Sequence, residues 1–444
     1  MGDGLEDLEK SNTIVDFNEL ITKAYSILKK YPLCNHCLGR LFAKYGLELR
    51  NEERGFAVKT MLQIHLYELI KKKQVSEKEL RIIAENGGEP FTRLYKKLYE
   101  ENIQSRSCYI CNNKLSRKYF EEIAANAANK LLDHNVYRFL VGVSLPPEIM
   151  MKELEVYQEL GLETTESLKN EMKREIGKII RERYGLEPDF NNPEATVIID
   201  FSNDTLHLIV SPILLEGRYW KRGRNISHTP WINREGVRVY PYSIQEFFEE
   251  SLKEVFDAEK VILHASGRED VDARMLGEGR PMVLEIKKPK FRYVDLGLVN
   301  ELIRSDLISG YINGYSSRAR IEYLKGEGSK KAKAYKLLVF SEKTLSGDEL
   351  KALEEFFRDR EIKQKTPSRI LRRKRDVLRI RKVYEIKTFQ LNPQVFDVLI
   401  YCSGGLYVKE LIHGDNGRTT PSFTEVLGTK LYPLEIDVFG VETL

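Results

Sequence analysis

The chain has 444 residues, of which 42% are hydrophobic and 31% are charged, and 71 basic residues nearly balance 67 acidic ones for a net charge of +4. This length and composition predict two or three globular domains with ordinary cores and exclude a polycation. No apolar run approaches the length of a membrane-spanning helix, and the start "MGDGLEDLEKSN" lacks the regions of a signal peptide. We therefore expect a cytoplasmic protein.

The amino-terminal half alternates helical and strand-like patterns. A first amphipathic helix is predicted over 17–31, where Pro32 ends it. The alternation that follows predicts a small α/β module and a first domain over residues 1–225. Further helices are predicted over 55–74, 120–134 and 165–184, and strands over 137–145, 194–201 and 205–215.

Two C-x-x-C pairs interrupt this half, "CNHC" and "CYIC", with the 70 residues from 38 to 107 between them. Structural disulfides are rare in the cytoplasm, whereas four thiolates brought together form a closed tetrahedral Zn²⁺ site. Redox pairs or unrelated buried cysteines are the alternatives. The predicted ligands of one structural zinc ion are Cys34, Cys37, Cys108 and Cys111.

A four-thiolate site leaves no open coordination position, so this zinc is expected to hold the fold and not to catalyse. His36, inside the first pair, is expected to be a bystander or an RNA contact. Cys402, in a strand-like stretch, is expected to be a small buried apolar residue.

A change of composition follows at residues 216–236, where basic and aromatic residues are interleaved. We interpret this stretch as an interdomain connector that touches nucleic acid, because aromatic rings stack on bases while cations meet phosphates. A linker packed against both domains by its aromatic rings is a compatible alternative. The predicted RNA contacts here are Arg218, Lys221 and Arg224.

The remainder, residues 236–444, is predicted to be a mixed α+β domain built on a sheet. Ser243 and Glu246 form a capping box for a helix over 243–258, and a second helix is expected over 346–357. Strand-like segments occur at 259–265, 281–289, 335–342, 381–391 and 396–412.

Residues 363–387 carry eleven Lys or Arg against Asp376 and Glu385, a local excess of nine positive charges. A polyanion such as RNA gains from such a stripe through counterion release, although a solvated surface face has the same composition. The predicted contacts in this stripe are Arg372, Arg373 and Arg375.

An acidic loop, "SGREDVDARMLGEGRP", follows the strand predicted at 259–265. A salt-bridged surface loop is the plainest interpretation of it. Asp270 or Asp272 with "Glu285-Ile286-Lys287" also resembles the D…E-x-K pattern of Mg²⁺-dependent nucleases. The third possibility is a single aspartate, held by a cation, that acts on a nucleobase without metal or cofactor.

The same loop, "GREDVDARMLGEGRP", resembles the active-site motif of the archaeal and eukaryotic tRNA pseudouridine-54/55 synthases, the tenth class of these enzymes. Segments similar to "YPLCNHCLGRLF", "CYICNNKL", "GRYWKRGRNISHTPW", "KAYKLLV" and "GGLYVKELIHGDNGRTTPS" occur in this family in the same order. The resemblance therefore spans nearly the whole chain. A chance D…E-x-K match does not explain this order.

The resemblance implies an α+β protein with an amino-terminal zinc-knuckle and THUMP-type α/β module. The carboxy-terminal synthase domain would be built on a mixed, largely antiparallel sheet. It implies an enzyme that acts on the TΨC arm of tRNA, at position 54, 55 or both, without an organic cofactor, and we expect a monomer. A zinc-containing tRNA-binding protein without activity is the remaining alternative.

The resemblance also assigns site residues. Asp270 aligns with the catalytic aspartate, with Asp272 as the second candidate, and Tyr335 with the tyrosine that stacks on the target uracil. Lys409 aligns with the basic partner of the aspartate. Arg268 is expected to orient a phosphate of the flipped nucleotide, and Leu411 to form an apolar wall beneath the base. Lys287 and Lys288 belong to "KKPKFR", which resembles a loop that reaches into the tRNA arm.

Overall fold

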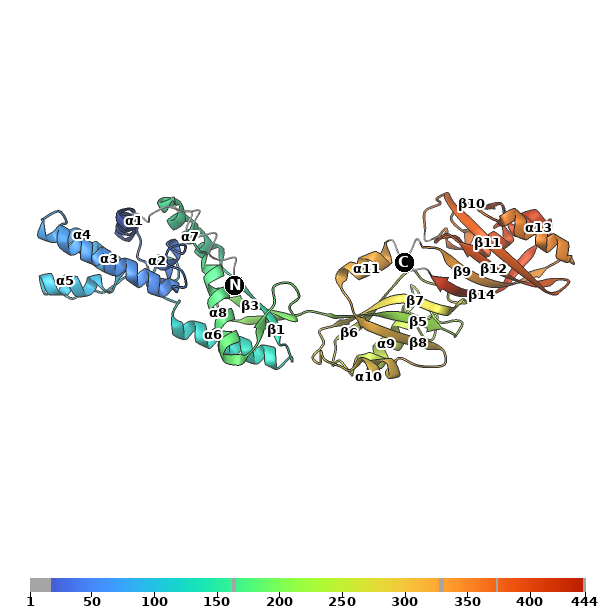
Figure 1. Ribbon diagram of the computed structural model, residues 1–444, viewed down its shortest axis with the longest axis horizontal. Helices are drawn as coiled ribbons and strands as arrows, with labels where there is room; N and C mark the ends of the chain where they lie inside the picture. Colours follow the sequence, from blue (N-terminus) through green and yellow to red (C-terminus); the bar gives the residue numbers. More distant parts are fainter. Residues whose placement is uncertain (1–16, 162–164, 327–330, 373, 442–444) are drawn as a thin grey trace, which may run out of the picture. The chain divides into compact units, whose positions relative to one another are not determined.

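The computed structural model describes residues 17–161, 165–326, 331–372 and 374–441, and the chain divides into two compact units between Ile209 and Val210 (Figure 1). The predicted boundary at residue 225 therefore lies inside the second unit. No helix in the described part of the chain is both long enough and apolar enough to cross a membrane.

The amino-terminal unit joins a group of helices to a small sheet. The predicted first helix is confirmed, and its inward residues Leu20, Ala24 and Ile27 are buried. The elements of this unit are α1 Phe17–Lys30, α2 Asn35–Leu41, α3 Asn51–Lys71, α4 Glu77–Gly87, α5 Phe91–Tyr99, α6 Arg117–Leu132, β1 Arg138–Ser144, α7 Pro147–Leu160, α8 Leu168–Tyr184, β2 Glu187–Pro188, β3 Ala195–Asp200 and β4 Leu206–Val210.

Helices α2 and α3 pack backbone to backbone through two glycines. A Cβ atom on Gly39 would lie 1.8 Å from the carbonyl oxygen of Asn51, and one on Gly55 would lie 1.9 Å from that of Asn35. Only glycine permits this approach, because a backbone atom cannot move aside as a flexible side chain can. The contact holds α2, which carries Cys37, against the longer helix α3.

The small sheet has the strand order β2-β1-β3-β4, and β1 runs parallel to both of its neighbours. Helices α6 and α8 pack against each other, and the inward residues Phe139, Val141 and Val143 of β1 are buried. The predicted α/β module is therefore confirmed. The predicted strand 205–215 is two strands: β4 stays in this sheet, and Ile213 begins a strand of the second unit.

The second unit is built on one ten-stranded sheet with the order β13-β10-β11-β12-β9-β14-β7-β5-β8, in which β6 also pairs with β7. Among the described pairs, only β7 and β14 run parallel, so the predicted mixed, largely antiparallel sheet is confirmed. Its elements are β5 Ile213–Lys221, α9 Ile244–Leu252, β6 Lys260–Ala265, β7 Arg274–Lys287, α10 Leu296–Leu302, β8 Ile308–Tyr315, α11 Arg318–Lys325, β9 Lys333–Ser341, α13 Gly347–Phe357, β10 Arg360–Gln364, η1 Ser368–Ile370, β11 Arg379–Asn392, β12 Val395–Cys402, α14 Val408–His413, β13 Thr419–Thr420, α15 Phe423–Leu427 and β14 Leu431–Val441.

Two core clusters lie along this sheet and meet at its centre. One includes residues of α9, β5, β6 and β8, and the other, the carboxy-terminal core cluster, includes residues of α13, α14, α15 and β12. Tyr335 on β9 packs against both clusters, while Ile436 and Val438 on β14 belong to one each. The central strands β9 and β14 therefore carry the junction between the two clusters.

The stretch 216–236, predicted to connect the domains, starts as an inner strand. β5 pairs with β7 on one side and β8 on the other, and its residues alternate between buried and half-buried positions. The prediction of an interdomain connector was wrong, because basic residues such as Lys221 usually lie at the protein surface. In the structure Lys221 is 1% exposed.

The close approach of α2 and α3 predicts a large effect of one methyl group. Gly55→Ala should lower the stability of the amino-terminal unit by about 1–3 kcal/mol, because the new Cβ meets immobile backbone. Gly177→Ala in α8 is the control, since nothing lies within 4 Å of its added Cβ. That variant should gain up to about 1 kcal/mol. Calorimetric unfolding of the full chain measures both, and equal shifts would contradict the packing described here.

Candidate active site and metal centre

The acidic loop predicted from the sequence joins β6 to β7, and hydrogen bonds from the side chain of Lys221 hold it in place. The Nζ of Lys221 donates hydrogen bonds to the carbonyl oxygens of Ile226 at 3.1 Å, Asp270 at 3.2 Å and Val271 at 3.0 Å. Burial lowers the pKa of this amine to about 8. Lys221 therefore anchors the loop, and the prediction that it contacts RNA was wrong.

A buried ion pair fixes the start of the same loop. Glu269 Oε2 accepts from Arg280 Nε at 2.8 Å and from the hydroxyl of Tyr219 at 2.9 Å, and both charged side chains are about 1% exposed. Burial opposes the ionised form of Glu269, but the charge of Arg280 outweighs it and holds the carboxyl pKa below its usual value. Arg280 Nη1 also donates to the Ser266 carbonyl at 2.8 Å. The pair thus ties the loop to β5 and β7.

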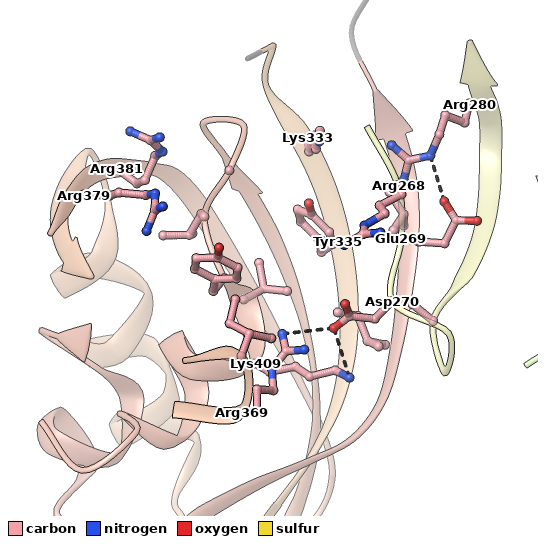
Figure 2. A pocket seen from close by; sticks show the side chains of 18 of the residues that line it. Arg268, Glu269, Asp270, Arg280, Lys333, Tyr335, Arg369, Arg379, Arg381 and Lys409 are labelled. Carbon is pink, nitrogen blue, oxygen red and sulfur yellow. Dashed lines mark hydrogen bonds and ion pairs between the residues drawn. The ribbon is translucent and has the colours of Figure 1, made fainter. Parts of the chain in front are cut away.

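Beyond this anchor the loop presents the carboxylates of Asp270 and Asp272 to the cations of other elements, and Figure 2 shows Asp270 with Arg369 and Lys409. The Asp270 carboxylate lies 3.1 Å from Arg369 and 3.4 Å from Lys409 Nζ. Lys409 lies closer to Asp272, at 2.6 Å. Partial burial would raise the pKa of Asp272, but the hydrogen bond and charge of Lys409 hold that pKa below its usual value. Lys409 was expected to pair with the catalytic aspartate, and in the structure it contacts both candidates, Asp270 and Asp272.

Arg369 was not singled out from the sequence, where it is one of the basic residues of the 363–387 stripe. Its Nε donates to Glu410 at 2.7 Å, and the Glu410 side chain is only 2% exposed. The buried glutamate thus orients the guanidinium so that its other end meets Asp270. The charge excess of the stripe was the only sequence signal that pointed to this residue.

These groups open into a cavity of about 360 Å³ over β9 and β14, within the size range of ligand pockets. Eight basic and two acidic side chains line it. Arg379 and Arg381 stand on one side, Arg268 on the other, and Tyr335 between them (Figure 2). Five of the lining cations have no carboxylate partner among the described residues: Arg268, Lys333, Lys374, Arg379 and Arg381. The cavity therefore suits an anionic ligand.

The structure brings together Asp270, Arg268, Tyr335 and Lys409, all of which line the cavity. Burial raises the pKa of the Tyr335 hydroxyl well above its ordinary value. Leu411, expected beneath the base, is fully buried in the carboxy-terminal core cluster and does not line the cavity. It lies in α14, and the apolar part of the cavity wall comes from Ala273, Ile370, Leu406, Val408, Ile436 and Val438.

The predicted RNA contacts fall into different environments. Arg224 is occupied by Glu435 at 2.7 Å and Asp437 at 3.0 Å, and Arg218 donates to the carbonyl oxygens of Glu278 and Gly279. Both therefore have structural partners. The side chains of Lys287, Lys288, Arg372 and Arg375 are exposed, and Arg373 lies outside the described residues.

The D…E-x-K alternative is not supported by the placement of its residues. Glu285 is buried on β7 and accepts from His264 Nε2 at 2.8 Å and from Arg318 at 2.9 Å. Asp270 and Asp272 are paired with Lys409 instead. Within the described chain, these carboxylates do not form a group of three or more close potential metal ligands.

Such a group does form from the four predicted cysteines. One ligand atom from each lies within 4.8 Å of all the others, and the Sγ atoms of Cys34 and Cys111 are 3.5 Å apart. Tetrahedral zinc with Zn–S bonds of about 2.3 Å requires sulfur atoms about 3.8 Å apart. The donor set therefore fits one metal ion bound by four thiolates.

Charged residues surround this cysteine cluster. Arg40 is fully buried, donates to Cys37 Sγ at 3.3 Å and lies 3.3 Å from Glu153. His36 is 6% exposed, with Nδ1 2.8 Å from Glu171, so it is a buried neighbour of the cluster and not an exposed RNA contact. These partners orient α2 and thereby the two cysteines at its start.

The family model of the Pus10 carboxy-terminal domain matches residues 214–442, and that of the archaeal Pus10 THUMP domain matches residues 123–200. The chain is 49% identical to the tRNA pseudouridine synthase Pus10 of Thermosphaera aggregans over 97% of this chain and 98% of that protein. The corresponding protein of Ignisphaera aggregans is 41% identical over 95% and 99% of the two chains. The chain belongs to the Pus10 family.

The limits of the Pus10 models agree with the two units of the structure. The THUMP match covers the strands β1 and β3 and the helices α7 and α8, and the carboxy-terminal match begins at the second residue of β5. This supports a boundary near residue 210 and explains why the basic and aromatic residues of 216–221 are part of the second unit.

Because Glu269 and Arg280 form a buried ion pair, we expect that neutralising one of them lowers the free energy of unfolding. Glu269→Gln leaves Arg280 without its counter-charge and should lower stability by about 3–5 kcal/mol. Glu278→Gln removes the same charge from a side chain that is 73% exposed and 4.0 Å from Arg218, and should change stability by less than about 0.5 kcal/mol. Thermal unfolding of both variants tests this, and similar losses would show that the pair does not anchor the loop.

Proposed function

We propose that the protein is a tRNA pseudouridine synthase that isomerises uridine at position 54, 55 or both in the TΨC arm. The observation that carries the proposal is the Asp270 carboxylate, held between Arg369 and Lys409 at the edge of a cavity with excess positive charge. The names of the Pus10 relatives and the motif resemblance support the same activity.

The reaction suits a site of this kind. The target nucleotide leaves the RNA stack at a cost of a few kcal/mol, which contacts in the cavity offset. Asp270, which lies between its two cations, acts on the uridine; the glycosidic bond breaks, the uracil rotates, and C5 bonds to the ribose. C5 loses a proton and N1 gains one, so the product is an isomer and no group donor is needed.

The other residues of the cavity have roles that follow from their positions. The Tyr335 ring, between the two cationic sides of the cavity, offers a face on which the uracil stacks (Figure 2). Arg268 is exposed at the rim and has no partner among the described residues, which suits it to a phosphate. Asp272 holds Lys409 in place and is a positioning residue in this scheme.

Further tRNA contacts are proposed from exposed basic residues. The carboxy-terminal stripe contributes Arg372 and Arg375, and Lys287 and Lys288 lie exposed at the end of β7. The amino-terminal unit is proposed to bind tRNA through its THUMP module, which the family match places at residues 123–200. A monomeric state and a cytoplasmic location stay predictions.

The four-cysteine cluster is proposed to bind one structural Zn²⁺. All four ligands come from protein thiolates, so the ion would cross-link α2 to the 108–111 turn and would not take part in catalysis. Cys402 is separate from this cluster: it is fully buried in the carboxy-terminal core, and burial raises its thiol pKa to about 12.

The activity is tested with an unmodified tRNA transcript and base-resolved mapping of pseudouridine in the presence of EDTA. Asp270→Asn keeps the size of the side chain and removes its charge. It should reduce the single-turnover rate by at least about 10³-fold, while tRNA affinity stays within about threefold.

Asp272→Asn is the matched control for that variant. It removes the same charge two residues away and should reduce the rate by no more than about 30-fold, since Lys409 loses only its closer partner. An inactive Asp272→Asn beside an active Asp270→Asn would reverse the assignment. Shortening of the tRNA that depends on Mg²⁺ would instead support a nuclease.

Metal content tests the cysteine site independently of activity. Purified wild type should contain one zinc per chain, and Cys34→Ser should lose it because three thiolates hold the ion more weakly. Cys402→Ala should keep the full content, since Cys402 lies in the other unit. Elemental analysis measures all three proteins, and equal zinc in wild type and Cys34→Ser would contradict the four-cysteine site.

A further inference from the structure

The active-site cavity contains a buried amine to which the scheme above gives no role. Lys333 is the first residue of β9, two positions before Tyr335, so both side chains leave the same face of the strand. Lys333 is 7% exposed and lines the cavity. Figure 2 shows it next to Tyr335 on the strand, with Tyr335 lying between Lys333 and Asp270 in this view.

The Lys333 amine has no acceptor or counter-charge within the described part of the chain. No hydrogen bond or ion pair to Nζ exists among the described residues, although those residues bury nearly all of its side chain. Its Nζ lies over Gly267, 3.3 Å from where a Cβ would be, and the guanidinium of Arg280 lies 3.5 Å from the same point. The adjacent Glu269 is paired with Arg280.

The surroundings of Lys333 disfavour the charged form of its amine. Burial and the charge of Arg280 lower the pKa of Lys333 to about 8, which reflects the cost of placing a second cation here. The amine faces the cavity, so a molecule that enters the cavity can accept a hydrogen bond from it.

The depth at which each cation lies in the cavity indicates which part of a nucleotide it would contact. The exposed cations at the cavity, Arg268 and Lys374, are placed for phosphates, which stay hydrated at the rim. Lys333 is buried beside the ring of Tyr335, where the flat base of an extruded nucleotide would lie. Uracil has two carbonyl oxygens that need donors once they are removed from water.

We propose that Lys333 Nζ donates a hydrogen bond to a carbonyl oxygen of the target uracil and holds the ring while it is rearranged. This inference rests on the proposed function. The isomerisation exchanges N1 with C5 across the axis through N3 and C6, and O2 and O4 exchange places at the same time. A donor fixed at either carbonyl therefore finds an acceptor in both the uridine and the pseudouridine, so Lys333 keeps the ring in the same plane before and after the rotation.

The test uses Lys333→Met, which keeps an apolar stem and removes the amine, in the full-length enzyme. The single-turnover rate at saturating tRNA should fall about 10- to 100-fold, as expected for one lost hydrogen bond to a charged donor. The tRNA dissociation constant and its salt dependence should stay unchanged, because a base contact releases no counterions. Lys336→Met is the control: its side chain leaves the opposite face of β9 and pairs with Asp397 at 2.9 Å, so its rate should equal that of wild type.

Substrates with a single sulfur identify the contacted atom. Transcripts carrying 2-thiouridine or 4-thiouridine at the target position replace one carbonyl oxygen by a poor acceptor. With one of the two, the ratio of wild-type to Lys333→Met rates should shrink toward one, as in a double-mutant cycle. An unchanged ratio for both substrates would overturn the proposal.

Other outcomes separate the competing explanations. Weaker tRNA binding and a salt dependence reduced by about one phosphate would mean that Lys333 contacts the backbone, and would overturn the base contact. A lowered melting temperature with the same rate loss on all three substrates would mean that it only supports the Gly267 turn. Absence of pseudouridine in the wild-type reaction would refute the proposed function, before any comparison of variants.

Discussion

The buried pair between Glu269 and Arg280 is the interaction on which the rest of the site depends. A loop rich in charge and glycine has little apolar surface with which to fix itself, so it takes its position from this pair and from the Lys221 amine beneath it. Both anchors come from strands β5 and β7, and β5 is paired on both of its edges, so the loop is attached to the interior of the sheet. Asp270 and Asp272 are therefore carried by a loop whose start is fixed, and both contact Lys409. This is the kind of preorganisation that a catalytic carboxylate needs.

The charged side chains of the cavity differ in how deeply they lie and in whether they have a partner. The cations that touch Asp270 are themselves positioned by carboxylates, Arg369 by the buried Glu410 and Lys409 by Asp272. Other cations of the lining have no such partners among the residues that the structure describes, which gives the cavity a positive field that favours a nucleic acid. One junction between two core clusters thus provides a carboxylate paired with cations, an aromatic face and exposed cations suited to phosphate.

Local patterns and motifs predicted much of this fold. The helix at 17–31, the α/β module, the four cysteines and the cavity residues Asp270, Arg268, Tyr335 and Lys409 were all accessible to sequence reasoning, because each rests on a spacing or on a motif. The failures share one cause, since burial depends on tertiary packing. Lys221 is of a residue type that usually lies at the surface, but here it lies inside the sheet. Leu411 packs into the core and does not line the cavity. Arg369 contacts Asp270 only because the fold brings two distant segments of the chain together.

The central claim is that an extruded uridine meets Asp270 and β9 inside this cavity. The most direct measurement is photo-crosslinking of the Asp270→Asn enzyme to tRNA with 5-bromouridine at the target position, followed by mass spectrometry of the linked peptide. The account predicts crosslinks within residues 266–273 or on Lys333 and Tyr335. Crosslinks confined to another part of the chain, such as the separate pocket at residues 413–433, would contradict it.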